Sequence, residues 1–378
     1  MKPRYPESSD ERAARLVGAI RRMRLSEGNT ESLQPVLPSQ DRFERHIAAQ
    51  LKAAAPEHSE LAEATAARMA RDGLLTARGL IKGDIRQADL KPETMAFTEA
   101  VILVTGRPAW FVRHDTPQTQ ETGADRIADE FWITTMSLEV NRLHDICARV
   151  GCIMLGSSED SLAPIATGWM IGNNTLVTNA HVGKLLARQN LALAGNDPRD
   201  GWRMIPGKRA VVDFAFENDV DRKVRFDVDN VMYVEDSETP DIAIFTLKVP
   251  AGGSVPPSPI TLDLAKRSNW TDTKIFAAGH PVKDLQSDRN VVTVFGALDG
   301  TKRFSPGFCS GVLGTDVLTH DCSTTNGSSG SPLIEFGSLQ AVGLHYFGNP
   351  GERNEAVMLA AVANHPAIVK SLSDGWGV

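Results

Sequence analysis

From Val150 onward the chain consists of short β-rich runs separated by Gly, Asn, Asp and Pro. Few folds are compatible with this pattern. Branched and aromatic side chains fit the pleated surface of a sheet, whereas Gly, Pro, Asn and Asp favour turns. Many short strands at this spacing are typical of an antiparallel β-barrel or β-sandwich. We therefore predict a mainly β domain with strands at residues 152–155, 168–171, 175–178, 210–214, 242–247, 274–278, 291–295 and 339–345.

The first third of the chain has a helical pattern instead. The run Ser8-Ser9-Asp10-Glu11 has the form of a capping box, and apolar residues then recur at helical spacing. We predict helices at residues 9–25, 43–51, 59–73 and 129–148, the third of them ending at Gly73 because glycine often terminates helices. Residues 110–112 have a strand pattern. We expect a small helical region at residues 1–128 that precedes a domain at residues 129–378.

The charge balance argues against a nucleic-acid partner. The chain of 378 residues carries 40 Lys and Arg against 47 Asp and Glu, and its formal net charge of −7 does not favour a phosphate backbone. A group of basic residues lies near the N-terminus, and we interpret it as the solvated face of the first helix. They are Arg12, Arg15, Arg21, Arg22 and Arg24.

Composition also predicts a cytoplasmic protein with no membrane partner. Residues 1–10 carry Pro, Ser and charge rather than the apolar run of a secretory signal, and no later stretch has the length and apolarity of a membrane span. The cysteines lack the spacing of metal ligands, so we expect reduced thiols, no metal and no other cofactor. They are Cys147, Cys152, Cys309 and Cys322.

Two candidate catalytic residues stand at the ends of predicted strands. His181 follows one strand, and Asp241 directly precedes another. An imidazole at the rim of a sheet can act as a general base, and a carboxylate can accept from its far nitrogen and hold it in one tautomer. Asp229 and Asp236 are competing candidates. We prefer Asp241 because it abuts its strand.

The most specific motif is Thr324-Thr325-Asn326-Gly327-Ser328-Ser329-Gly330-Ser331-Pro332. Glycine two residues before Ser329 permits an unusual backbone that would point the Gly327 and Ser329 amides at one spot. Two such amides form an oxyanion hole beside a nucleophilic serine. A flexible linker is the alternative interpretation, but an apolar run beginning at Pro332 follows at once, so we favour a catalytic loop.

Three blocks, Thr-Asn-Ala-His-Val, Asp-Ile-Ala-Ile and Gly-Ser-Ser-Gly-Ser-Pro, resemble in this order the signature blocks of trypsin-like serine peptidases. The bacterial branch with the glutamyl endopeptidases is the most similar, and the resemblance covers about residues 150–372. It implies a chymotrypsin-like fold of two six-stranded antiparallel β-barrels, the first carrying His181 and Asp241 and the second Ser329. It also implies a serine endopeptidase that cleaves protein or peptide substrates through these three residues. Residues 129–378 would be the protease domain, and residues 1–128 would recruit a regulatory protein partner or restrain the enzyme.

The resemblance predicts substrate-binding residues as well. Ser323, Thr324 and His345 would line the pocket for the side chain before the cleaved bond, and Tyr346-Phe347-Gly348 would pair with the substrate backbone. Ser323 stands where trypsin has an acid. Thr324 and His345 match the hydroxyl and imidazole with which glutamyl endopeptidases hold a Glu side chain, so we expect a preference for acidic residues.

Two departures and two alternatives complete the interpretation. Val182 replaces the disulfide cysteine of vertebrate relatives, and Ser328 replaces the Asp that pairs with their freed N-terminus, so we do not expect activation by that route. An α/β-hydrolase is disfavoured because Ser331 breaks the Gly-x-Ser-x-Gly motif and because the base precedes the nucleophile. A catalytically inactive protease fold, kept for binding or recruitment, remains the alternative.

Overall fold

The computed structural model describes residues 59–91, 107–119, 129–189 apart from 138, 201–282 apart from 238, 298–348 and 354–366, with scattered positions at 13–48, 94–98 and 368–369. Its internal contacts divide the chain into two units. Unit 1 comprises Met1–Pro108, Thr122–Leu138 and Asp288–Gly296, and unit 2 comprises Ala109–Glu121, Glu139–Ser287 and Ala297–Val378. Along the described part, no helix combines the length and the apolarity that crossing a membrane requires.

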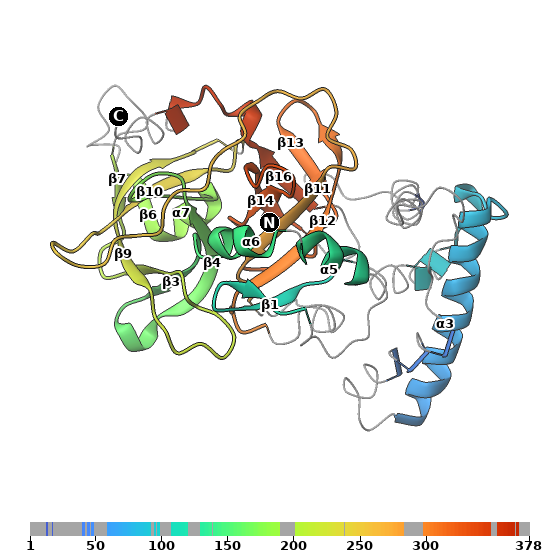
Figure 1. Ribbon diagram of the computed structural model, residues 1–378. Coiled ribbons are helices and arrows are strands. Elements are labelled where there is room, and N and C mark those ends of the chain that lie inside the picture. Colours follow the sequence, from blue (N-terminus) through green and yellow to red (C-terminus); the bar gives the residue numbers. More distant parts are fainter. Residues whose placement is uncertain are drawn as a thin grey trace. The chain divides into compact units, whose positions relative to one another are not determined.

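Unit 1 contains the helix α3 (Ser59–Lys82), the 3-10 turn η2 (Gln87–Asp89) and the helix α5 (Asp129–Ser137) (Figure 1). The prediction that the third helix ends at Gly73 is wrong. Leu74 and Leu80 continue the buried face of α3 beyond that glycine. The helix ends before Gly83, whose φ of +82° is the left-handed conformation that terminates helices.

The single helix predicted at residues 129–148 is also wrong, because two helices occupy this stretch. α5 ends at Ser137 and α6 (Val140–Cys147) begins after Glu139, whose backbone is not helical at φ −129° and ψ 11°. The strand predicted at residues 110–112 is confirmed as β1 (Trp110–Arg113). The helices expected at 9–25 and 43–51 and the strand expected at 291–295 lie largely or wholly outside the described residues.

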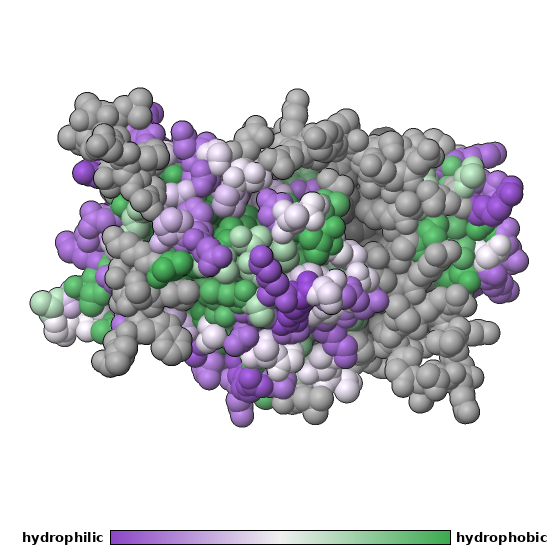
Figure 2. Space-filling model, turned by 90° about the horizontal axis from the view of Figure 1, so that it is seen from above, coloured by the Kyte–Doolittle hydropathy of each residue, from purple (hydrophilic) through white to green (hydrophobic). Residues whose placement is uncertain are grey.

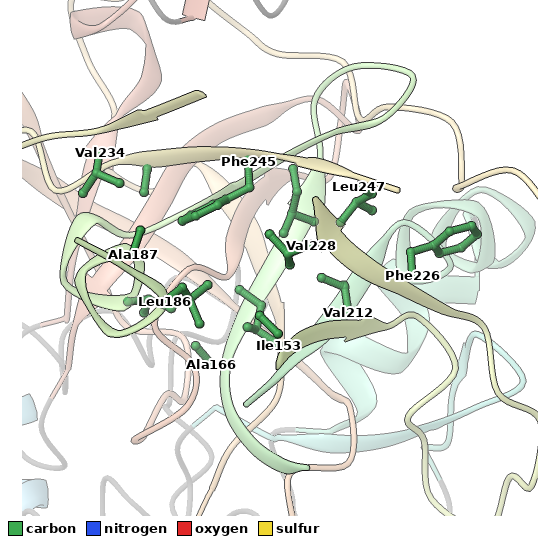
Figure 3. Close-up of a cluster of buried hydrophobic side chains, with 14 of the residues drawn as sticks. Ile153, Ala166, Leu186, Ala187, Val212, Phe226, Val228, Val234, Phe245 and Leu247 are labelled. Carbon is green, nitrogen blue, oxygen red and sulfur yellow. The ribbon is translucent and has the colours of Figure 1, made fainter. Parts of the chain in front are cut away.

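The first barrel of unit 2 closes in the strand order β10-β5-β4-β3-β8-β9. Buried apolar side chains from these strands and from α7 (Ala180–Leu186) point into it and form its core (Figure 3). β6 (Ala187–Gln189) and β7 (Trp202–Met204) form a separate pair after α7. The barrel strands are β3 (Val150–Gly156), β4 (Ala163–Met170), β5 (Thr175–Thr178), β8 (Arg209–Asp213), β9 (Arg225–Val234) and β10 (Ala243–Leu247).

The second barrel runs in the order β11-β14-β15-β16-β13-β12 and closes because β12 also pairs with β11. Its strands are β11 (Lys274–Gly279), β12 (Arg303–Leu313), β13 (Val317–His320), β14 (Pro332–Glu335), β15 (Ala341–Phe347) and β16 (Asn354–Met358). Short 3-10 turns are η3 (Glu159–Ser161) and η4 (Leu359–Ala361). Two closed six-stranded antiparallel barrels confirm the predicted mainly β, chymotrypsin-like fold class.

The second barrel carries an additional hairpin from the first third of the chain. β1 pairs with β12, Trp110 lying opposite Phe304, and β2 (Thr116–Pro117) pairs with β1. Trp110 is fully buried and its ring stacks on Phe304 with centroids 6.3 Å apart. The domain limit at residues 128 and 129 stays a prediction, and the pairing adds that residues 110–117 pack with the second barrel.

The surface of the barrel unit mixes apolar and polar residues. Figure 2 shows green hydrophobic residues beside purple hydrophilic ones on one face. Its exposed large apolar side chains, among them Leu185 and Val255, come from different segments of the chain. Scattered exposure of this kind is usual in folded proteins and indicates no binding surface.

Candidate active site

Antiparallel pairing of β5 with β10 brings His181 and Asp241 together. Ala243 of β10 lies opposite Thr178 of β5, so the residues just before β10 meet the turn just after β5. His181 Nδ1 lies 2.7 Å from Asp241 Oδ2, and the His181 backbone N–H donates to Asp241 Oδ1 at 3.0 Å. One carboxylate thus holds both the ring and the main chain of the histidine.

Burial makes this contact effective. Asp241 is only 4% exposed, and its backbone carbonyl accepts from Asn179 Nδ2 at 3.0 Å. A hydrogen bond that water hardly reaches is electrostatically stronger than one at the surface. The competing candidates Asp229 and Asp236 are exposed, and Asp236 pairs with Lys184 instead. Because Asp241 occupies Nδ1, His181 keeps Nε2 for a substrate or a nucleophile.

Two peptide groups beside Ser329 are fixed in direction. The Asn326 carbonyl accepts from the Val282 N–H at 2.7 Å, and the Ser328 carbonyl accepts from the Ser331 N–H at 2.9 Å. In a trans peptide the N–H points away from the C=O, so the Gly327 and Ser329 amides are turned to the side opposite these donors. Among the described residues, neither of the two amides donates to a backbone carbonyl.

Gly327 must be glycine for two reasons. Its φ of +82° lies in the left-handed region, which costs other residues energy. A Cβ at this position would also lie 2.3 Å from the backbone oxygen of His280 and 2.9 Å from the nitrogen of Val282. The unusual backbone that the sequence predicts before Ser329 is therefore observed, and close packing against residues 280–282 supports it.

The loop that carries Ser329 lies against the strand that leads to His181. Ser329 is half-buried, and the next residue, Gly330, donates its N–H to the His345 carbonyl at 2.9 Å. A Cβ on Gly330 would come within 2.5 Å of Thr178 Oγ1, and Thr178 stands three residues before His181 in the chain. The fold thus places the predicted serine loop of the second barrel against the end of β5, three residues before His181.

The predicted pocket residues Thr324, His345 and Gly348 surround one point. Thr324 and His345 are buried, and a Cβ on Gly348 would lie 2.5 Å from Thr324 Oγ1 and 3.2 Å from His345 Cε1. Asn354, which the sequence did not indicate, joins them: its Oδ1 accepts from Thr324 Oγ1 at 3.1 Å and its Nδ2 donates to the Cys322 carbonyl at 2.7 Å. These polar side chains are thus hydrogen-bonded to one another and to the backbone.

A second residue that the sequence did not assign, His320, contacts His345. Its Nε2 lies 3.1 Å from His345 Nδ1, and both rings are buried. Burial lowers the pKa of His320 to about 3. Burial, followed by repulsion from His320 and His181, holds the pKa of His345 well below its usual range. Both imidazoles are therefore neutral at pH 7.

Of the remaining predicted residues, Tyr346 and Phe347 belong to β15, and Ser323 directly precedes Thr324. Ser323 and Tyr346 are half-buried and Phe347 is buried, and Tyr346 Oη donates to Glu355 Oε2 at 2.5 Å. Pro332, the first residue of β14, pairs with Leu344 of β15. The last residues of β15, from Tyr346 onward, therefore lie beyond β14. In the described residues, no group of three or more His, Cys, Asp or Glu side chains is arranged to hold a metal ion.

Comparison with known proteins finds similarity to a peptidase family over this part of the chain. Residues 166–344 match the family model of the trypsin-like peptidase domain. A similar solved structure is the Rv3671c protease from M. tuberculosis in its active form, with 18% identity and a TM-score of 0.38, covering 60% of this chain and 82% of that chain. Another is an inactive serine-to-alanine mutant of Rv3671c from M. tuberculosis H37Rv, with 18% identity and a TM-score of 0.37, covering 62% and 91%. No curated protein matches the chain in sequence.

Proposed function

We propose that the chain, with its trypsin-like peptidase domain at residues 166–344, is a serine endopeptidase that uses His181, Asp241 and Ser329 as a catalytic triad. The observation that carries the proposal is the 2.7 Å contact of His181 Nδ1 with the buried Asp241 carboxylate. This contact holds the imidazole in the tautomer in which Nε2 can accept a proton, as a general base must.

The proposed reaction is acyl transfer to Ser329. Its Oγ attacks the carbonyl carbon of the cleaved bond and passes its proton to His181 Nε2, while Asp241 stabilises the imidazolium. The Gly327 and Ser329 amides donate to the oxygen of the tetrahedral intermediate. His181 then protonates the leaving amine, the C–N bond breaks, and a water molecule, deprotonated by His181, releases the acyl group from Ser329.

We also propose a preference for acidic residues before the cleaved bond. The buried polar cluster of Thr324, His345 and Asn354 supports this idea, because its hydroxyl, imidazole and amide groups can exchange bonds within the cluster for bonds to a carboxylate. A substrate carboxylate entering this site would raise the pKa of His345 and pair with the imidazolium that forms. Ser323 and the edge of Tyr346-Phe347-Gly348 would bind the substrate beside this pocket.

A fluorophosphonate probe tests the proposed nucleophile without knowledge of the substrate. We expect wild-type protein to be labelled at Ser329 and to digest casein, and Ser329→Ala to do neither. Ser338→Ala, which removes a hydroxyl bonded to Glu335 in the same barrel, is the matched control and should react like wild type. A folded wild-type protein that is not labelled would reject the enzyme and favour the inactive binding module.

A cleavage profile on peptides derived from a proteome tests the specificity. We expect Glu and Asp to dominate the position before the cut, since His345 and Thr324 can hydrogen-bond a carboxylate. Cleavage mainly after Lys, Arg or large apolar residues would remove the proposed preference but leave the serine mechanism intact.

Two further proposals concern setting and regulation. The four cysteines are buried thiols without a disulfide bond, which supports work in the reducing cytoplasm. We propose that residues 1–128 recruit a protein partner or restrain the enzyme. The informative deletion ends at Pro108, because it keeps Trp110 and β1 on the second barrel. Unchanged casein digestion by this shortened chain would argue against restraint.

A further inference from the structure

We propose that Thr167, on β4 of the first barrel, is the positioning residue that shapes the oxyanion hole on the second barrel. This inference rests on the proposed function. Thr167 is fully buried and lies 160 residues before Gly327 in the chain, yet its hydroxyl donates to the Gly327 carbonyl at 2.8 Å. Its backbone N–H donates to the Ser329 carbonyl at 2.9 Å.

Thr167 therefore holds two of the four carbonyls in the loop from Asn326 to Ser329. The other two accept from Val282 and from Ser331, both close to the loop in the second barrel. The Thr167 contacts are the ones that reach across from the first barrel. They hold the peptide between Gly327 and Ser328 and the peptide between Ser329 and Gly330, each of which directly follows one of the two amides that would face an oxyanion. Fixing these neighbouring peptides limits the rotation of both amides.

The Thr167 hydroxyl has a defined direction. It accepts from the His280 N–H at 2.9 Å, so its single proton is free to be donated to the Gly327 carbonyl. His280 also supplies the backbone oxygen against which Gly327 packs. One hydroxyl thus links the first barrel, the turn after β11 and the glycine that provides half of the oxyanion hole.

Close packing at Gly330 sets how near the Ser329 loop lies to β4. A Cβ on Gly330 would lie 2.0 Å from the Thr167 carbonyl oxygen, and that same oxygen accepts from Thr178 Oγ1 at 2.8 Å. Thr178 stands directly before the turn that carries His181. The strand pair that positions the general base therefore also positions the amides, and a shift of either would misalign both.

Thr167→Val tests the role of the hydroxyl, because valine keeps the branched shape of threonine. We expect kcat on casein and the rate constant of fluorophosphonate labelling to fall by about 10- to 100-fold, with KM changed less than about threefold, since misplaced amides weaken transition-state binding selectively. Thr167→Ser keeps the hydroxyl and should restore both rates to within about threefold of wild type. Urea unfolding measures the folded fraction of each protein.

Four outcomes would overturn the inference. They are a Thr167→Val rate within twofold of wild type, equal losses in the Val and Ser variants, a loss that appears in KM alone, and a loss no larger than the fall in folded fraction. If Thr167→Val does not fold, Thr167→Ala gives the same comparison without added bulk. A wild-type protein that the probe does not label would instead reject the proposed function, which separates the two failures.

Discussion

Replacing Gly327 with alanine should abolish most activity without unfolding the protein. A non-glycine residue at φ +82° costs about 1 to 2 kcal/mol. The added Cβ would lie 2.3 Å from the His280 oxygen, more than 1 Å short of an ordinary 3.4 Å contact. The backbone at residues 280–282 cannot simply retreat, because Val282 is hydrogen-bonded to the same loop through Asn326.

The loop itself must therefore move by a distance comparable to that overlap. Such a shift takes the Gly327 amide away from the oxyanion, and loss of one donor costs about 100- to 1,000-fold in kcat, or about 3 to 4 kcal/mol of transition-state stabilisation. Gly207→Ala is the matched control. Gly207 has φ +77° and no atom within 4 Å of an added Cβ, so alanine there pays only the backbone cost.

Casein digestion and fluorophosphonate labelling measure the loss of activity, and urea unfolding measures stability. We expect Gly207→Ala to lose about 1 kcal/mol of stability and to keep its wild-type rate. Gly327→Ala should lose somewhat more stability and nearly all of its rate. A Gly327→Ala rate within threefold of wild type would refute the assignment of its amide to the oxyanion hole.

Three further outcomes follow from the site. Asp241→Asn should lower kcat by about 10⁴-fold while leaving the protein folded, since the amide favours the wrong tautomer of His181. The rate of casein digestion measures this loss. Gly348→Ala should raise KM for peptides with Glu before the cut by about tenfold but leave fluorophosphonate labelling unchanged, because the added Cβ, 2.5 Å from Thr324 Oγ1, would displace the proposed carboxylate-binding groups. Acid should destabilise the fold. The pKa of His320 is about 3 in the folded chain, so its contribution is complete above pH 6.5 and is lost as the pH falls toward 3. When the pH falls from neutral to 5, wild type should lose about 2 kcal/mol more of its unfolding free energy than His320→Gln, and urea unfolding measures this difference. An equal loss in the two proteins would contradict the burial argument.

The fold class could be predicted because its signals are local. Short β runs and turn residues mark most strands, and β5 was placed at its observed limits, 175–178. Helix limits were predicted less well. Gly73 lies inside α3, since burial of Leu74 and Leu80 outweighs the glycine, and the break at Glu139 has no signal in the apolar spacing.

The candidate site also contains residues that the sequence indicates and residues that only the structure reveals. His181, Asp241 and Ser329 stand beside strong motifs, and the chain alone indicates them. Thr167, His320 and Asn354 do not, because strand pairing in three dimensions brings each to its partner. His320 meets His345 only because β16 lies between their strands, which no local pattern of residues records.

The two barrels are each continuous in the chain, the first spanning β3 to β10 and the second β11 to β16. A chain leaving the ribosome can therefore close the barrel of His181 and Asp241 before Ser329 has been made. The proposed nucleophile reaches its place only after β16 completes the second barrel and Thr167 bonds to the Ser329 loop. If the proposed triad is correct, a half-made chain lacks a complete active site, and neighbouring nascent proteins would be safe from it until synthesis of the second barrel is finished.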